Sequence, residues 1–131
     1  MIKVLVAGKR KPGLSRHQMQ HHALSVHADL VKSAPGFWQH CHRYVQNHVI
    51  GGFGLADGQL VTTDATDFDV VAEFWFDSTD SAMKAWTSDD YLNLLRPDEL
   101  KIADSDAPFL MLYGTEHVIG GSDPAMRGSF S

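Results

Sequence analysis

Residues 68–76 read FDVVAEFWF, and this stretch decides the fold class. Its β-branched and aromatic residues predict a strand. Every residue on one side of that strand is apolar: Phe68, Val70, Ala72, Phe74 and Phe76. The other side still carries Val71 and Trp75, and residues 108–112 (PFLML) are apolar on both sides. The strands of an antiparallel sheet with one solvent-exposed face alternate apolar and polar residues. Because these strands are apolar on both sides, both faces of this sheet must be covered.

The segments before this strand predict a strand, a helix and a second strand. Residues 2–7 (IKVLVA) predict the first strand. Ser15 and Gln18 form a capping-box pattern for a helix that runs to about Ala34, where Pro35-Gly36 stops it. Helical spacing gives this helix an apolar stripe made of Met19, Ala23, Val26, Leu30 and Ala34. Residues 38–48 (WQHCHRYVQNH) then predict a polar strand rich in aromatic residues.

The remaining segments predict a loop, a helical region and a last strand. Residues 49–67 hold four glycines and little periodicity, so we predict a long loop: a lid, a binding loop or a disordered segment. A helix is expected over 78–86, and a further helical piece over 89–95 should end at Pro97. Residues 108–119 predict the last strand.

This order of elements, β-α-β followed by β-α-β, is typical of a ferredoxin-like α+β domain. Its four antiparallel strands would form one sheet with both helices on one face. Because helices cover only one face, a second copy of the same sheet is expected on the other, through a two-fold interface. The sequence therefore predicts a homodimer.

Composition narrows the class of protein. The chain has 131 residues, and we predict one domain over 1–119 and a flexible tail over 120–131. A net charge of −5 without a basic face argues against nucleic-acid binding. Cys41 is the only cysteine, which excludes an intrachain disulfide. No signal peptide or membrane span is evident, so a cytoplasmic protein without a membrane partner is expected.

At this point the sequence resembles the EthD family of the dimeric α+β barrel superfamily. Five motifs carry the resemblance, in the same order and with compatible spacing. They are KRKPGLS at 9–15, HADLV at 27–31, YVQNH at 44–48, DVVAEFWFDS at 69–78 and DELKIAD at 98–104. Asp29 stands where the family has proline, and Ile102 stands where it has phenylalanine.

The resemblance implies a dimeric barrel that binds a small organic molecule. Similar fungal proteins act as decarboxylases or dehydratases on aromatic polyketides. Related barrels isomerise lactones or oxidise anthrones without a cofactor. The family name itself comes from a bacterial gene cluster for ether breakdown.

His27 is the first candidate catalytic residue. It lies about 30° from the centre of the predicted apolar stripe. A histidine that faces the core needs a partner for each ring nitrogen. It is therefore either a structural histidine bonded to the sheet or a general acid or base that faces an apolar cavity. The family motif favours the second interpretation.

His48 is the second candidate catalytic residue. On a regular strand it shares one face with Trp38, His40, His42, Tyr44 and Gln46, a row that suits the lining of a cavity or a face packed on the partner subunit. We assign the remaining substrate-binding positions to Tyr44, Asn47, His42, Trp75 and Phe74. Asn47 points to the other face of a regular strand, where its amide could instead fix the following loop.

The other reactive side chains have plainer explanations. His40 and His42 could share a metal ion, but a site needs a third ligand, so we expect no metal. Cys41 lies on the opposite face from both histidines and is expected to be a buried filler. For Asp69 and Glu73 we favour ion pairs with Lys3 or Arg43 over proton donation. The sequence lacks the glycine-rich nucleotide-binding motifs, so no cofactor is expected.

The sequence thus favours a cofactor-independent enzyme that binds a phenolic, polyketide-like or lactone compound. The chemistry would be proton transfer: decarboxylation, dehydration, lyase cleavage or isomerisation. The alternatives are an oxidative role, as a cofactorless monooxygenase or an accessory protein in ether or aromatic degradation, and a binding or stress protein without turnover.

Overall fold

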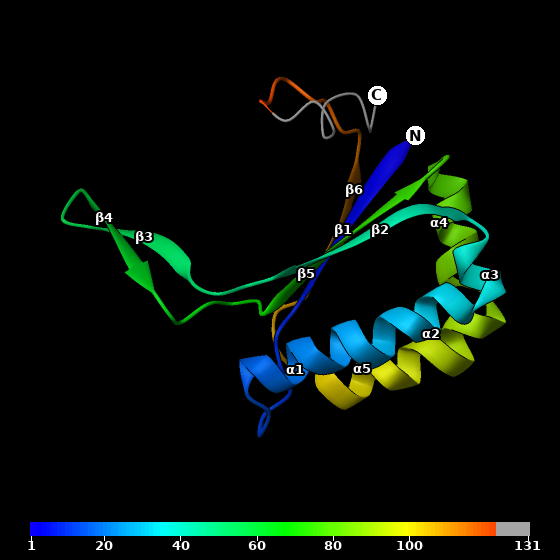
Figure 1. The fold of residues 1–131 in the computed structure, drawn as a ribbon, viewed down its shortest axis with the longest axis horizontal. Coiled ribbons are helices and arrows are strands. Elements are labelled where there is room, and N and C mark those ends of the chain that lie inside the picture. The colour runs from blue at the N-terminus through cyan, green and yellow to red at the C-terminus, as the bar shows by residue number, and fades with distance from the viewer. Residues whose placement is uncertain (123–131) are drawn as a thin grey trace.

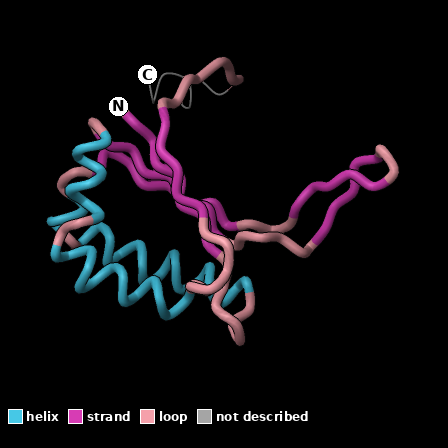
Figure 2. Tube along the Cα trace, turned by 180° about the vertical axis from the view of Figure 1, so that it is seen from behind, coloured by secondary structure: helices cyan, strands magenta, loops and turns pink. Residues whose placement is uncertain are grey.

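A computed structural model describes residues 1–122 of the chain. Its main sheet has four antiparallel strands in the order β2-β5-β1-β6. They are β1 (Ile2–Gly8), β2 (Cys41–His48), β5 (Val70–Phe76) and β6 (Leu110–Gly114). All the helices lie on one face of this sheet (Figures 1 and 2). The predicted α+β fold with its ferredoxin-like strand order is confirmed.

The first helical region begins at the predicted capping box. The backbone N–H of Gln18 donates to Ser15 Oγ at 3.0 Å, and the backbone N–H of Ser15 donates to Gln18 Oε1 at 2.8 Å. The region then runs as α1 (Arg16–His22), the π-helical turn η1 (Ala23–His27) and α2 (Ala28–Ser33). The short helix α3 (Pro35–Trp38) follows, so the predicted second strand begins later, at Cys41.

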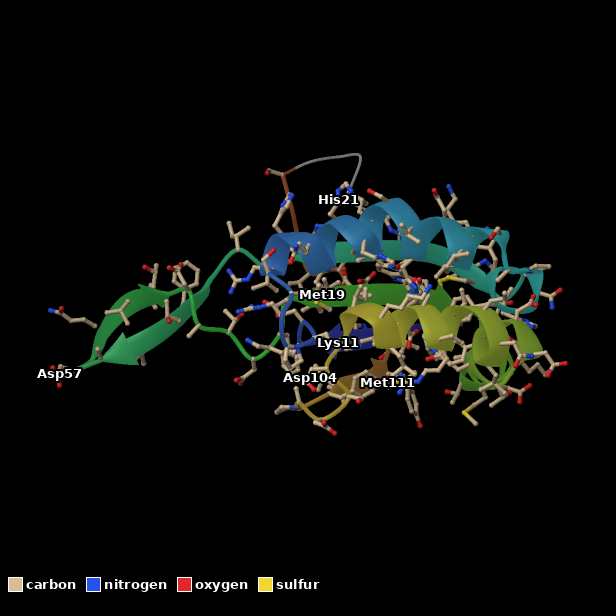
Figure 3. The ribbon with its side chains drawn as sticks, turned by 90° about the horizontal axis from the view of Figure 1, so that it is seen from below. Lys11, Met19, His21, Asp57, Asp104 and Met111 are labelled. Carbon is tan, nitrogen blue, oxygen red and sulfur yellow. The ribbon has the colours of Figure 1, made fainter. Side chains whose placement is uncertain are left out.

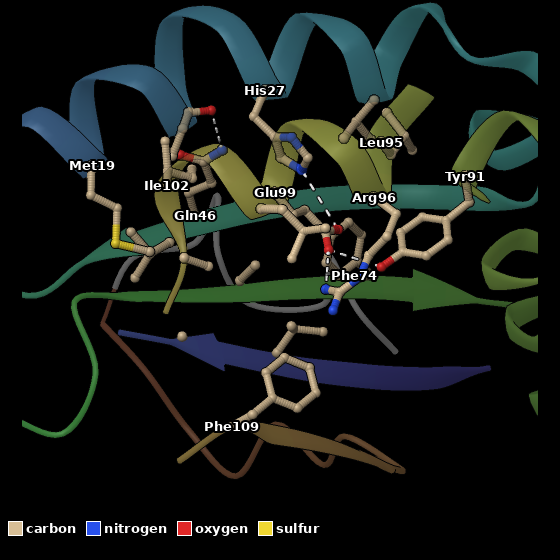
Figure 4. A pocket seen from close by; sticks show the side chains of 18 of the residues that line it. Met19, His27, Gln46, Phe74, Tyr91, Leu95, Arg96, Glu99, Ile102 and Phe109 are labelled. Atoms are coloured by element: carbon tan, nitrogen blue, oxygen red, sulfur yellow. Dashed lines mark hydrogen bonds and ion pairs between the residues drawn. The ribbon is translucent and has the colours of Figure 1, made fainter. Parts of the chain in front are cut away.

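The π-helical turn changes which residues face the sheet. A wider turn rotates the residues that follow it, so the buried positions after Met19 and Ala23 include Val31 and Ala34. Val26, which was predicted in the apolar stripe, is 42% exposed, and that prediction is wrong. His27 turns toward the sheet in its place (Figure 4).

The second helical region is longer than predicted. It comprises α4 (Thr79–Trp86), a second π-helical turn η2 (Tyr91–Leu95) and α5 (Arg96–Ile102). The expectation that helical structure ends at Pro97 is wrong. Pro97 lies in the first turn of α5, where a proline is tolerated because a backbone N–H there needs no partner.

An aromatic core joins the helices to the sheet. Phe37 of α3 is completely buried against Phe74 and Phe76 of β5 and Trp86 of α4, with ring centroids 5.1–6.1 Å apart. This core fills one end of the space between the layers. The other end, beneath η1 and α5, is less tightly filled.

Residues 49–67 do not form the predicted loop. They contain a hairpin of β3 (Gly52–Ala56) and β4 (Gln59–Thr63), which we call the arm. The arm extends away from the sheet, with Asp57 at its tip (Figures 1 and 3). Asp57 and Gly58 have φ values of 52° and 77°, the positive angles of a type I′ hairpin turn. The glycines at 51, 52 and 54 obscured the strand pattern on one side of this turn.

The last strand, β6, is shorter than the predicted 108–119. Of the predicted tail at 120–131, residues 123–131 lie outside the described part of the chain. Over residues 1–122, no helix is long and apolar enough to cross a membrane.

Candidate functional site

A cavity of about 290 Å³ lies between the helical layer and the sheet. Its wall is mostly apolar and includes Met19, Val31, Phe74, Leu95, Ile102 and Phe109 (Figure 4). Phe74 was predicted to contact substrate, and the structure places it in this wall. Several polar side chains interrupt the wall, among them His27, Gln46, Tyr91, Arg96 and Glu99. An apolar cavity with a few convergent polar groups is typical of a small-molecule site.

His27 points from η1 into this cavity (Figure 4). Its Nδ1 lies 2.8 Å from Oδ2 of Asp98, at the start of α5. The His27 side chain is only 12% exposed, and Asp98 is 3% exposed. A carboxylate at Nδ1 holds the proton on that nitrogen and leaves Nε2 free to accept one. The geometry is that of an oriented general base.

Asp98 is held by a second histidine as well. Nε2 of His22, one turn earlier in the same helical region, lies 2.9 Å from Oδ1 of Asp98. Burial alone would raise the pKa of Asp98, but hydrogen bonds with His22 and His27 outweigh burial and hold the pKa below its ordinary value. Asp98 is therefore a carboxylate at neutral pH, with each oxygen committed to one imidazole.

Glu99 forms a second polar cluster at the cavity wall. Its Oε2 accepts hydrogen bonds from the Tyr91 hydroxyl at 2.9 Å and from Arg96 Nη1 at 3.2 Å. Its Oε1 lies 3.9 Å from Nε2 of His27. Burial, followed by the charge of Glu99, raises the pKa of Tyr91, so its hydroxyl stays protonated. Nε2 of His27 thus lies near a carboxylate whose other oxygen pairs with the Arg96 guanidinium.

Gln46 connects the strand β2 to the π-helical turn. Its Nε2 donates to the Ala23 carbonyl at 2.8 Å and to the Tyr44 hydroxyl at 2.7 Å, and its Oε1 lies 2.8 Å from His48 Nε2. Tyr44, a predicted substrate-binding residue, lines the cavity, and burial raises its pKa to about 12. The link to Ala23 ties η1, and therefore His27, to the sheet.

His48 does not face the same cavity as His27. It borders a second, more open groove between the first helical region and β2, which Leu24 and Lys32 also line. His48, the second candidate catalytic residue, therefore lies outside the cavity that His27 faces within one protomer. His48 contacts the cavity wall through its hydrogen bond with Gln46, and it is paired in the sheet with Val70, which also lines the cavity.

Three other predicted substrate-binding residues also lie away from the cavity. A β-bulge between Cys41 and Arg43 breaks the strand alternation, so His42 is exposed and pairs with Asp77 at 2.7 Å. Asn47 donates instead to the Val71 carbonyl at 3.0 Å and to Glu73 at 3.1 Å, on the sheet face that the helices leave open. Trp75 lies on that open face too.

The open face of the sheet carries its own charged network. Nζ of Lys3 pairs with Glu73 and lies 4.9 Å from the ring centroid of Trp75. The predicted ion pair for Glu73 is therefore confirmed. Asp69 pairs instead with Arg10 at 2.9 Å and Arg16 at 3.0 Å, so its predicted partners were wrong.

The bulge also changes the surroundings of Cys41. Burial raises the pKa of this thiol to about 11, which makes it a poor nucleophile at neutral pH.

Over the described part of the chain, no group of three or more His, Cys, Asp or Glu residues is placed to hold a metal ion.

The sequence interpretation missed most of the polar residues at the site: His22, Gln46, Tyr91, Arg96, Asp98 and Glu99. One signal was available, because Asp98 and Glu99 open the family-like stretch at 98–104. Their position beside His27 depends on the packing of α5 against η1, which local sequence does not show.

The EthD domain model matches residues 11–106 of this chain. The chain belongs to the EthD domain family. This match spans both helical regions and every polar residue of the cavity named above. No curated protein matches the chain.

Solved structures share the EthD fold at low identity. An EthD family protein from Bacillus halodurans is 20% identical, with a TM-score of 0.60, and the alignment covers 89% of this chain and all of that one. An EthD-like protein from Ralstonia eutropha is 19% identical, with a TM-score of 0.58 and coverage of 86% and 88%.

Two further structures are more distant. A dimeric protein of unknown function with a ferredoxin-like fold, from Bacteroides fragilis, is 11% identical, with a TM-score of 0.55 and coverage of 86% and 93%. HapK from Hahella chejuensis is 12% identical, with a TM-score of 0.55 and coverage of 94% and 98%. Identities this low show a shared fold, but they do not show a shared reaction.

Proposed function

We propose that this EthD-family protein is a cofactor-independent enzyme that binds a small, largely apolar organic molecule and transfers a proton on it with His27. One observation carries the proposal: the His27 ring lies between a buried carboxylate, Asp98, and an apolar cavity. A histidine needed only for stability could satisfy its polar atoms without facing a cavity. Here Nδ1 is fixed by Asp98, and Nε2 lies at the cavity wall, 3.9 Å from Oε1 of Glu99, which also lines the cavity.

The proton would pass between substrate and Nε2 of His27. When Nε2 takes a proton from a carbon or hydroxyl of the substrate, the ring becomes a cation, and the Asp98 charge stabilises it. The same proton can return to the product or to a leaving group, so proton balance needs no cofactor. Decarboxylation, dehydration, lyase cleavage and isomerisation all use such a transfer.

Negative charge that develops on the substrate also needs stabilisation. Arg96 lines the cavity and carries a fixed positive charge next to Glu99. A guanidinium aimed at a forming enolate or phenolate lowers the energy of the transition state. The apolar remainder of the wall favours a phenolic, polyketide-like or lactone substrate with its polar end toward His27 and Arg96.

We also propose that the active form is a homodimer packed through the open face of the sheet. Leu5 and Leu112 are directly paired on this face, and Val45 lies on the same side of β2. The side chain of Leu112 is 54% exposed in the protomer. Apolar side chains around the Lys3–Glu73–Trp75 network would be covered by the same face of a second copy.

The proton-transfer proposal can be tested with a generic carbon acid. Nitrobenzisoxazole is a small apolar compound that opens to a phenolate after loss of one proton, and the product is coloured. We expect His27→Ala to lower turnover by about 10²–10⁴-fold. His21→Ala is the matched control, because His21 is exposed on the far side of the same helical region (Figure 3). Circular dichroism checks the fold of both variants.

Equal rates for wild type, His27→Ala and His21→Ala would contradict the proposal. Retained binding of the compound with equal rates would favour a carrier without turnover.

A further inference from the structure

The arm is a two-stranded hairpin, and within residues 1–122 one of its faces is apolar and largely exposed. Phe53 pairs with Thr62 across the hairpin and Leu55 pairs with Leu60, so these four side chains share one face. Phe53, Leu55 and Leu60 are 78%, 77% and 68% exposed. An isolated two-stranded hairpin is at best marginally stable in water. Three large exposed apolar side chains on one face indicate a contact surface.

We propose that the arm clasps a second copy of this chain, so that each protomer of the homodimer holds its partner through Phe53, Leu55 and Leu60. This inference rests on the homodimer proposed above and adds an interaction surface to it. The catalytic proposal for His27 does not depend on it.

The direction of the arm supports this partner. The arm leaves the sheet where β2 ends and β5 begins, and it bends toward the side away from the helices (Figures 1 and 2). The open face of the sheet looks toward that same side. A second copy packed on the open face would therefore meet the arm as well.

The charge of the arm also favours another copy of this chain. Residues 49–63 contain one charged residue, Asp57 at the turn, whereas the whole chain carries a net charge of −5. An almost uncharged arm can approach a second acidic chain with little repulsion. It also lacks the basic residues with which a protein binds nucleic acid or an anionic membrane surface.

The size of the sheet gives a further argument. Four strands spaced about 4.8 Å apart and about 20 Å long present about 400 Å² of flat face, or about 800 Å² for two copies. A stable protein–protein interface buries about 1,200–2,000 Å² in total. The open sheet face is therefore a modest surface for a stable dimer, and two arms would enlarge the buried area.

Charging the apolar face of the arm tests the proposal. We expect Leu55→Lys/Leu60→Lys to raise the dimer dissociation constant at least about 30-fold, the loss typical of removing a binding hot spot. Met83→Lys/Leu92→Lys is the matched control, with the same added charge at residues 57% and 53% exposed in the helical layer. It should change the constant less than about threefold. Sedimentation at several concentrations measures the constant, starting from a wild-type species near twice 14.5 kDa.

A cross-linking experiment locates the contact. A photoreactive phenylalanine analogue at position 53 should, in a mixture of isotopically light and heavy copies, join light peptides to heavy ones. Cross-links confined to single copies, a monomeric wild type, or an unchanged constant for Leu55→Lys/Leu60→Lys would overturn the clasp. If the arm variant dimerises normally while Leu112→Lys does not, the sheet interface stands and the clasp alone fails.

Discussion

Nδ1 of His27 and Oδ2 of Asp98 lie 2.8 Å apart, although 71 positions separate the two residues in the chain. This contact joins the π-helical turn η1 to the first turn of α5, on the helical side of the cavity. It holds the His27 ring in one orientation, which is the basis of the role as a base that we propose for this residue.

The first prediction concerns Asp98. Asp98→Asn keeps the shape of the side chain but replaces one acceptor oxygen with an NH₂ donor. His27 can then adopt the tautomer whose Nε2 carries the proton and cannot act as a base. We expect turnover of nitrobenzisoxazole to fall by about 10²-fold or more with the fold intact. Asp80→Asn, at an exposed position of α4, is the control. Unchanged turnover in Asp98→Asn would show that Asp98 does not orient the base.

The second prediction concerns His22 and stability. His22→Ala removes the partner of Asp98 Oδ1 and leaves that oxygen poorly satisfied in a buried position. The free energy of unfolding should fall by about 1–3 kcal/mol. His21→Ala, next to it in the chain but exposed, should change it by less than about 0.5 kcal/mol. Urea unfolding measures both, and equal values would mean that the His22 contact adds no stability.

The third prediction concerns pH and Asp69, which is completely buried. Burial would raise its pKa, but hydrogen bonds from the Arg10 backbone and the Arg16 side chain outweigh burial and hold the pKa below its ordinary value. Such a carboxylate adds stability above its unfolded pKa of about 4 and loses it as the pH falls through the lower folded pKa.

We therefore expect Asp69→Asn to lower the free energy of unfolding by about 3 kcal/mol at neutral pH. Below about pH 4 the gap between variant and wild type should narrow, because the wild-type carboxylate is then being protonated as well. Urea unfolding at a series of pH values measures this gap. Asp67→Asn, two residues away and exposed, is the control. A gap that stays constant down to low pH would exclude the role of this charge.

The fourth prediction separates Gln46 from His48. Gln46→Leu removes the hydrogen bonds to the Ala23 carbonyl and to Tyr44, and with them the link between η1 and the sheet. Turnover should fall about tenfold or more, because small displacements of a base are costly. His48→Ala, outside the cavity, should have a smaller effect than Gln46→Leu. The reverse order would indicate that His48 reaches the substrate, for example in the dimer.

Local sequence predicted a helix or strand correctly where that element depends on neighbouring residues. The capping box of Ser15 and Gln18 and the apolar side of β5 predicted their elements because each depends on contacts within a few positions. The Asp57-Gly58 turn was equally local but was overlooked, since the glycines before it obscured the strand. His42 was misplaced because a single bulged residue reverses the strand alternation, and the sequence carries no clear mark of that bulge.

The candidate site likewise combines features that local sequence predicts with contacts that only the tertiary structure shows. The sequence by itself determined that the chain forms an α+β domain and that His27 lies near the buried side of a helix, because apolar periodicity fixes which side is buried. Only the tertiary structure decided what His27 meets there. The extra residue in η1 rotates its ring toward the cavity, and the packing of α5 brings Asp98 and Glu99 to it from a distant part of the chain. Contacts of that kind depend on how two helices pack on one sheet, and no short stretch of residues encodes them.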